Sequence, residues 1–317
     1  MPPRRRIGKR LVKSFLPIAL VIVLAVVGAL SFIVYCVSRP TKRPYVVTPE
    51  SFSRISGRAI KVTDETWANS DGRNARGWLL KGAEGAPAVV LLHRYGGDRS
   101  WLFNLGVKIN ETTNFTILWP DLRGHGENPL IKSTSIGVNE GADLLDAVQY
   151  LRGLKSGQKP LVGASLGVYG VELGAYSALK AARGEPQIKV LVLDSVVSSP
   201  NELLQTAVSS CVGLDNGLIH SFSRLAMKAY MLGAYDDTGA CDYASAIRDQ
   251  RVLLLSGNDA GPLRDSTAAL QKCFPNAGNV EVRTDLPLSG FGLPSVTGEQ
   301  GEAYDRVVIE FFARNLR

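Results

Sequence analysis

The stretch Pro160–Gly170, P-L-V-G-A-S-L-G-V-Y-G, constrains the fold of this chain more than any other. Within it, Gly163-Ala-Ser165-Leu-Gly167 matches the pattern G-x-S-x-G, between an apolar run and a helix-competent run over 168–182. A serine at the apex of a sharp strand-to-helix turn has a strained backbone, and flanking glycines avoid collisions with the neighbouring strand and helix. The pattern predicts that the Ser165 hydroxyl projects from the sheet beside backbone N–H groups that stabilise an oxyanion. An ordinary glycine-rich turn is the alternative.

The segments on either side alternate between strand and helix patterns. Continuous apolar runs predict strands that are buried on both faces, and an early pair around a Ser-Asp-Gly turn predicts an antiparallel opening. Spacings of three and four residues predict helices. The expected strands are 58–62, 76–81, 86–92, 115–119, 188–193, 251–255 and 280–283, and the expected helices include 139–154, 263–273 and 302–316. This alternation predicts an α/β fold with a doubly wound, mostly parallel sheet.

An uncharged run of 23 residues, Phe15–Val37, precedes this region. As a helix it would be roughly 34 Å long, enough to cross a bilayer. Six basic residues come before it and three follow closely, which predicts a single-pass anchor with a cytoplasmic N-terminus. We therefore expect a basic cytoplasmic tail over 1–14, a transmembrane anchor over 15–37 and a linker over 38–55. A cleaved signal peptide, cut near Val27-Gly28-Ala29, is the alternative.

The net charge of +7 belongs to the N-terminal segment. Residues 1–43 contain nine basic and no acidic residues, so the rest of the chain carries a net charge of −2. This leaves no basic surface of the kind that binds nucleic acid. The three histidines are scattered, which argues against a metal centre, and the sequence indicates no cofactor.

The four cysteines suit an exported domain, in which disulfides are stable. Cys211 and Cys241 could pair across the segment 195–250, although spacing alone does not fix connectivity. Cys36 lies inside the apolar run, where we interpret it as a filling residue.

The segment 195–250 is longer than one crossover helix requires, and contains two helical patterns, 201–212 and 218–232. An apolar stripe at helical spacing runs along the second pattern; its members are Leu218, Ile219, Phe222, Leu225, Ala226, Ala229 and Tyr230. The commoner interpretation is the core face of a packed helix. A lipophilic lid over a pocket is the other, and it would suit an acyl ester or thioester as substrate.

The chain resembles proteins of the α/β-hydrolase fold, and the resemblance covers about residues 56–317. It rests on the order of four motifs: H-x-x-G-G at 93–97, D-x-R-G-H-G at 121–126, G-x-S-x-G at 163–167 and a Gly-x-Asp segment ending at 259. Similar proteins are serine hydrolases of the esterase, lipase or serine aminopeptidase-like kind. The resemblance implies an α/β-hydrolase domain with a helical lid insertion over about 195–250.

The resemblance also implies roles for individual residues. Ser165 matches the nucleophile, and Asp259 matches the acid that orients the catalytic base. Leu166 would supply one N–H group of the oxyanion hole, and Arg94 or Tyr95 the other. His93 and His125 match positions that support loops.

The expected catalytic histidine is missing from the loop between Arg283 and Glu302. There, Ser289-Gly290-Phe291-Gly292 places phenylalanine where similar proteins have histidine, and phenylalanine cannot accept a proton. His220 in the insertion is the candidate substitute base, although a histidine on the polar side of a helix would look the same.

Two functions remain open. The first is a membrane-anchored serine hydrolase, with its domain on the non-cytoplasmic side, that acts on an ester, thioester or amide through Ser165. Its partners would be a small-molecule or acyl substrate and the membrane. The second is a catalytically silent binding or scaffold protein of the same fold.

Overall fold

A computed structural model describes the backbone of residues 5–57, 59–293 and 299–316, with side chains from residue 15 onward. The chain forms two compact units, residues 1–37 with 204–235, and residues 38–203 with 236–317. We call them the helical unit and the sheet unit. The predicted tail over 1–14 lies partly outside the described residues, as does part of the loop between Arg283 and Glu302.

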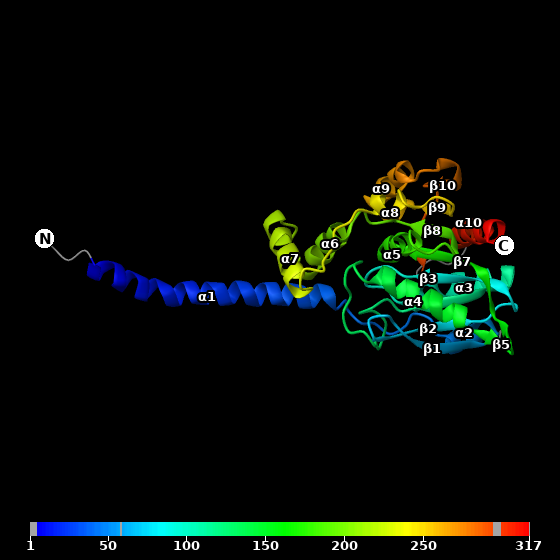
Figure 1. The fold of residues 1–317 in the computed structure, drawn as a ribbon, viewed down its shortest axis with the longest axis horizontal. Coiled ribbons are helices and arrows are strands. Elements are labelled where there is room, and N and C mark those ends of the chain that lie inside the picture. The colour runs from blue at the N-terminus through cyan, green and yellow to red at the C-terminus, as the bar shows by residue number, and fades with distance from the viewer. Residues whose placement is uncertain (1–4, 58, 294–298, 317) are drawn as a thin grey trace. The chain divides into compact units, whose positions relative to one another are not determined.

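In the described part of the sheet unit, eight strands form one sheet in the order β1-β2-β4-β3-β7-β8-β9-β10 (Figure 1). The pairs β1–β2 and β2–β4 are antiparallel and the other neighbours are parallel. The strands are β1 (Val62–Ala68), β2 (Asn74–Leu80), β3 (Ala86–Leu92), β4 (Thr116–Pro120), β7 (Val162–Val171), β8 (Ile188–Asp194), β9 (Arg251–Leu255) and β10 (Val280–Arg283). A short hairpin, β5 (Lys155–Ser156) and β6 (Lys159–Pro160), precedes β7.

Helices cover both faces of this sheet. On one face α3 (Phe103–Thr113) packs against α10 (Glu299–Asn315), and on the other α4 (Glu140–Gly153) packs against α5 (Leu173–Ala182). Alternate residues of the central strands, such as Val89, Tyr169 and Val192, join the core beneath α3 and α10. The intervening residues are equally buried, because a parallel sheet has no solvent-facing side. The remaining helices are α2 (Pro49–Ser56), α6 (Pro200–Val212), α8 (Ala240–Ala244) and α9 (Leu263–Ala269).

The predicted doubly wound sheet is therefore confirmed. The first strand begins later than expected, since β1 starts at Val62 where the sequence indicated a strand ending there. Its pairing partner matches the expectation, because β1 and β2 are joined through the turn at Ser70–Gly72 and run antiparallel.

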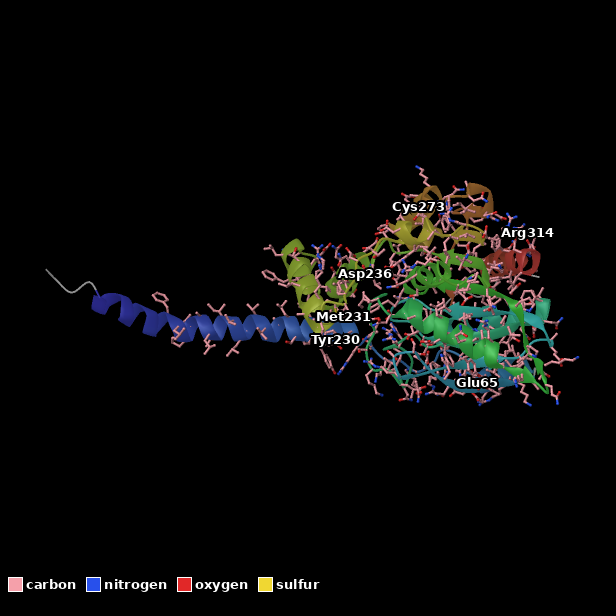
Figure 2. All side chains as sticks on the ribbon, in the orientation of Figure 1. Glu65, Tyr230, Met231, Asp236, Cys273 and Arg314 are labelled. Carbon is pink, nitrogen blue, oxygen red and sulfur yellow. A yellow bond between two sulfur atoms is a disulfide. The ribbon has the colours of Figure 1, made fainter. Side chains whose placement is uncertain are left out.

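The helical unit contains α1 (Arg5–Ser38), α7 (Gly217–Tyr230) and the part of α6 from Leu204 onward. The segment Phe15–Ser38 of α1 is long and apolar enough to cross a membrane, with a mean hydropathy of 2.9 over its most apolar window. Its side chains project outward along the helix (Figure 2). In α7, Leu218, Phe222 and Leu225 are exposed. The interpretation of the α7 stripe as the core face of a packed helix is therefore wrong.

Two disulfides are present, and both differ from the pairing considered above. Cys36 bonds Cys211 within the helical unit, and Cys241 bonds Cys273 within the sheet unit. Cys36 is thus a bonded residue rather than a filling residue, and the Cys211–Cys241 pair does not form. Spacing could not decide this, because the partners are brought together by helix packing over 175 and 32 residues of chain.

This pairing predicts a specific thiol count. The full-length protein from an oxidising compartment, denatured without reductant, should show no free thiol, and Cys36→Ser should expose one, Cys211. A colorimetric thiol assay with peptide mass mapping measures this. If Cys36→Ser exposed no new thiol, the Cys36–Cys211 bond would be refuted, and Cys273→Ser serves as the control that frees Cys241 instead.

Candidate functional site

The sharp bend between strand and helix lies at Glu172. β7 ends at Val171 and α5 begins at Leu173, so Glu172 alone makes the connection, with φ 52° and ψ −106°. Its N–H donates to the Asp194 carbonyl oxygen at 2.9 Å, and its own carbonyl accepts from the Tyr176 N–H at 3.0 Å, which starts the helix. A positive φ is costly for a residue with a side chain, so surrounding contacts must hold it there.

Two glycines make this bend sterically possible. A Cβ on Gly170 would lie 2.5 Å from the Gly174 backbone, and a Cβ on Gly174 would lie 2.4 Å from the carbonyl oxygen of Leu92 in β3. Both distances are shorter than real contacts allow. Residues Gly170-Val-Glu172-Leu-Gly174 therefore form the glycine-flanked bend that the sequence analysis placed at Gly163–Gly167. Glutamate stands at its centre in place of serine.

The prediction that Ser165 occupies the bend is wrong. Ser165 lies inside β7, near the amino end of the sheet, where the next residue, Leu166, pairs with Ile188 at the start of β8. The N–H of Leu166 donates to the Gln187 carbonyl at 2.9 Å, so Leu166 is a strand residue rather than a donor at the bend. Catalytic residues in parallel sheets lie at the carboxyl end, which is the opposite edge.

The glycines around Ser165 have a packing explanation. A Cβ on Gly163 would lie 2.6 Å from the Gly85 carbonyl oxygen, and one on Gly167 would lie 2.7 Å from the ring of Phe312 in α10. The G-x-S-x-G match is thus a glycine-rich stretch whose glycines are needed for packing, which is close to the alternative given in the sequence analysis. The sequence contains both candidates, since Gly170-Val-Glu172-Leu-Gly174 has the same glycine spacing as 163–167, and the local pattern does not choose between them.

The Glu172 carboxylate is held by backbone amides. The Tyr95 N–H donates to Oε2 at 2.9 Å, and the backbone of Leu173, next to the bend, helps to lower the pKa of the carboxyl. One amide comes from the loop after β3 and the other follows the bend residue, which is the arrangement of an oxyanion hole. Tyr95 thus lies where the sequence analysis placed it, whereas Leu173 takes the role assigned to Leu166. The side chain of the bend residue fills the hole that its neighbours form.

Burial dominates the electrostatics of Glu172, which is 7% exposed. Burial raises the pKa of this carboxyl to about 7, while the Arg94 guanidinium and the Tyr95 N–H partly oppose the shift. Arg94 lies over the rings of Trp101 and Phe291, at 4.4 and 5.3 Å from their centroids, and donates to the Tyr95 carbonyl at 3.1 Å. Arg94 therefore contributes its side chain to the site as a partial counter-charge.

The loop after β10 is fixed by two carboxylates. The Ser289 N–H donates to Asp259 at 2.6 Å, and the Gly290 N–H donates to Asp194 at 2.8 Å. Asp259 follows β9, in the short 3-10 helix Asn258–Ala260, so it lies after the expected strand. Its partner here is a loop amide, because residue 291 is a phenylalanine and offers no ring nitrogen. Asp259, which the resemblance assigns to orienting the base, therefore positions the loop after β10.

Asp194, at the end of β8, is a carboxyl that the sequence analysis missed. It is fully buried and accepts hydrogen bonds from Ser195 Oγ at 2.6 Å and Tyr304 Oη at 2.5 Å. Tyr304 in turn contacts Tyr169 Oη at 2.6 Å. Burial raises the pKa of Asp194 to about 6, although these hydrogen bonds lower it. An apolar strand ending in Asp-Ser was the available signal.

His93 and His125 do not serve as bases at the bend. His93 Nδ1 hydrogen-bonds the Arg94 carbonyl at 2.8 Å, and its Nε2 accepts the Leu122 N–H at 3.1 Å, which fixes a neutral ring. Burial lowers the pKa of His93 well below its usual range and that of His125 to about 4. His220 belongs to the helical unit, where Nε2 hydrogen-bonds Asp215 at 2.7 Å. Its role as a substitute base stays a prediction.

A cleft with about 460 Å³ of empty space lies between β1, β2 and the loop after β4. Trp67, Arg123 and His125 are among its lining residues. Trp67 Nε1 and His125 Nε2 are buried without a hydrogen-bond partner. In the described side chains, no group of three or more histidine, cysteine, aspartate and glutamate residues could hold a metal ion.

Comparisons with known proteins agree with this architecture. No family model and no curated protein matches the sequence. Among solved structures, an esterase of Pyrococcus furiosus is similar with a TM-score of 0.63 at 19% identity, covering 88% of this chain and 98% of that one. An acylaminoacyl peptidase of Pyrococcus horikoshii (TM-score 0.59, 16% identity, 84% and 43% covered) and a dienelactone hydrolase of Anabaena variabilis (0.54, 12%, 82% and 100%) are also similar. The chain has the α/β-hydrolase fold.

The steric role of Gly174 gives a first prediction for the site. Gly174→Ala should lower the free energy of unfolding by about 2–3 kcal/mol, because its Cβ would meet the Leu92 backbone in a close-packed region. Gly153→Ala, at the end of α4 with nothing within 4 Å, is the matched control and should change stability by less than about 1 kcal/mol. Urea unfolding measures both. Equal effects of the two substitutions would contradict the packing at the bend.

The raised pKa of Glu172 gives a second prediction. The folded protein binds the carboxyl proton of Glu172 more tightly than the unfolded chain does. The contribution of this proton to the free energy of unfolding is therefore lost as pH rises from about 4.5 to about 7. Glu172→Gln keeps an acceptor for the Tyr95 N–H and does not ionise. The free energy of unfolding of Glu172→Gln minus that of the wild type should therefore be larger at pH 8 than at pH 5 by about 1–3 kcal/mol.

Chemical denaturation at both pH values measures this difference. Glu310→Gln, at an exposed position of α10, is the control and should show no such increase. A Glu172→Gln difference that is the same at pH 5 and pH 8 would argue against a buried, titrating carboxyl at the bend.

Proposed function

We propose that this chain is a catalytically silent protein of the α/β-hydrolase fold, a membrane-anchored binding or scaffold protein. The observation that carries the proposal is the Glu172 carboxylate at the strand-to-helix bend, accepting the Tyr95 N–H at 2.9 Å. The bend residue is the one that would attack a substrate in a hydrolase of this fold. Here its side chain is an acceptor that occupies the amide pair itself.

Two further features argue against hydrolysis. An oxyanion formed on a substrate would have to displace the Glu172 carboxylate from the amides, at the cost of leaving a buried carboxylate without those donors. The position that would carry the base holds Phe291, whose ring faces the Arg94 guanidinium. Each feature alone would weaken hydrolysis, and together they remove the nucleophile, the base and the free oxyanion hole.

The serine hydrolase interpretation has lost its main support. It depended on Ser165 lying at the bend, and Ser165 lies in β7 instead. The similar structures are hydrolases by name, but at 12–19% identity they speak for the fold alone.

A binding role is supported by the cleft beside β1 and β2. Trp67 Nε1 and His125 Nε2 line this cleft, and both are buried without a hydrogen-bond partner. With Nδ1–H donating to the Arg123 carbonyl, His125 Nε2 is an acceptor, whereas the indole is a donor. A small polar ligand with both a hydroxyl donor and an acceptor would fit these groups.

Location on the non-cytoplasmic side is supported by two independent features. The basic residues before the apolar segment of α1 favour a cytoplasmic N-terminus. The disulfides Cys36–Cys211 and Cys241–Cys273 require an oxidising compartment on the other side. Cleavage after Ala29 would keep both disulfides but remove most of the apolar segment, so the intact mass of the mature protein distinguishes an anchor from a signal peptide.

The proposal predicts no intrinsic hydrolysis. The full-length protein should not react with a fluorophosphonate probe and should hydrolyse p-nitrophenyl esters at the buffer rate, with Ser165→Ala unchanged. Combining Glu172→Ser with Phe291→His should free the amides and supply a base, raising the rate by about 10-fold or more. Either substitution alone is the control and should stay near background.

A wild-type esterase rate that falls in Ser165→Ala or in Glu172→Ala would overturn the proposal of a silent protein. A silent double variant, by contrast, would show that residue 291 does not reach residue 172.

A further inference from the structure

The helix α7 has its polar and apolar faces reversed relative to an ordinary surface helix. Its buried residues are His220, Ser223 and Met227, and two of these three are polar. The residues Leu218, Phe222 and Leu225, spaced by four and three positions, form one stripe and are 70%, 52% and 63% exposed. An apolar stripe of this kind on the surface indicates a partner that excludes water.

The polar residues beneath α7 make local hydrogen bonds, although His220 Nδ1 is buried without a partner among the described residues. His220 Nε2 hydrogen-bonds Asp215, and Ser223 Oγ donates to the Ile219 carbonyl at 2.7 Å. The Asn216 side chain caps the helix by accepting the Leu218 N–H at 2.9 Å. The outward direction of the apolar stripe is therefore built into the helix by its cap and its buried contacts.

A covalent bond ties this region to the membrane helix. Cys211, six residues before α7, is bonded to Cys36, which lies near the end of the apolar segment of α1. Six residues of chain cannot extend beyond roughly 20 Å, so the start of α7 stays close to the membrane boundary. The helical unit therefore carries two apolar surfaces, one on α1 and one on α7, next to one another.

The directions of the two helices differ. Figure 1 shows α7 crossing the direction of α1 rather than running along it. Tyr230 and Met231, labelled in Figure 2, mark the end of α7. If α1 spans a bilayer, a helix that crosses its direction near its end lies along the membrane surface.

We propose that α7 is an interfacial membrane helix whose stripe Leu218, Phe222 and Leu225 inserts among the lipid acyl chains of the leaflet where α1 leaves the membrane. The polar side chains Arg224 and Lys228 would then lie at headgroup level. The inference rests on the anchor in the proposed function, and adds a second membrane contact that holds the start of the insertion on the bilayer.

Quenching by brominated lipids tests the inference with the full-length protein in phosphatidylcholine proteoliposomes. The four native tryptophans, Trp67, Trp78, Trp101 and Trp119, belong to the sheet unit, and their signal is subtracted with the wild type. Phe222→Trp places a reporter on the stripe. Lys228→Trp, about 120° around the same helix, is the matched control. Bromines at the middle of the acyl chain should quench Phe222→Trp at least about twofold more strongly than the control.

The outcomes separate this inference from the anchor. If the protein resists extraction with alkaline carbonate but Phe222→Trp and Lys228→Trp are quenched equally, the inference is overturned and the stripe faces a protein, a second copy or another chain. If carbonate releases the wild type, the anchor itself fails. A second reporter, Leu225→Trp, should reproduce the result of Phe222→Trp. Disagreement between the two variants would also overturn the inference that the stripe inserts into the bilayer.

Discussion

The carboxyl edge of the sheet depends on one backbone conformation, the positive φ at Glu172. Two glycines make it sterically possible, and the amides of Tyr95 and Leu173 hold the side chain that emerges there. The Glu172 N–H is held by the carbonyl of Asp194, whose carboxylate in turn fixes the loop after β10. The bend, the loop after β3 and the loop after β10 are thus joined through hydrogen bonds from backbone N–H groups to one carbonyl and two carboxylates. A hydrolase of this fold would use the same three segments for a nucleophile, an oxyanion hole and a base.

Two buried carboxyl groups lie at this edge. Glu172 and Asp194 are buried carboxyls with raised pKa values, and both accept backbone N–H groups rather than orient a histidine. Buried carboxyls are costly unless hydrogen bonds compensate them, so groups kept in this way have a structural role in ordering loops. The strained bend was therefore retained without the side chain that usually exploits it. This fits a protein whose fold serves binding.

The proposed membrane anchor belongs to the helical unit. α1 supplies an apolar segment, and the Cys36–Cys211 disulfide fastens the start of the α6–α7 region to its end. Because a disulfide restricts the separation of its two ends, the α6–α7 region cannot move far from the end of α1. The linker is also ordered on the sheet unit, since Tyr45 Oη donates to Asp121 at 2.8 Å and Val46 N–H donates to Ser100 Oγ at 2.9 Å.

The sequence by itself determined the parallel sheet, the strands from Ala86 onward except β7, the apolar segment of α1 and the missing histidine, because continuous apolar runs and residue types are local properties. It also indicated Arg94 or Tyr95 as a backbone N–H donor at this edge, since a loop with two glycines after a buried strand has few conformations. Only the tertiary structure decided which glycine pair flanks the bend, because Gly163 and Gly167 are required by Gly85 and Phe312, residues far away in the chain. It likewise decided the disulfide pairing and the outward face of α7. Each of these depends on which distant segments meet, and no pattern within one segment records that.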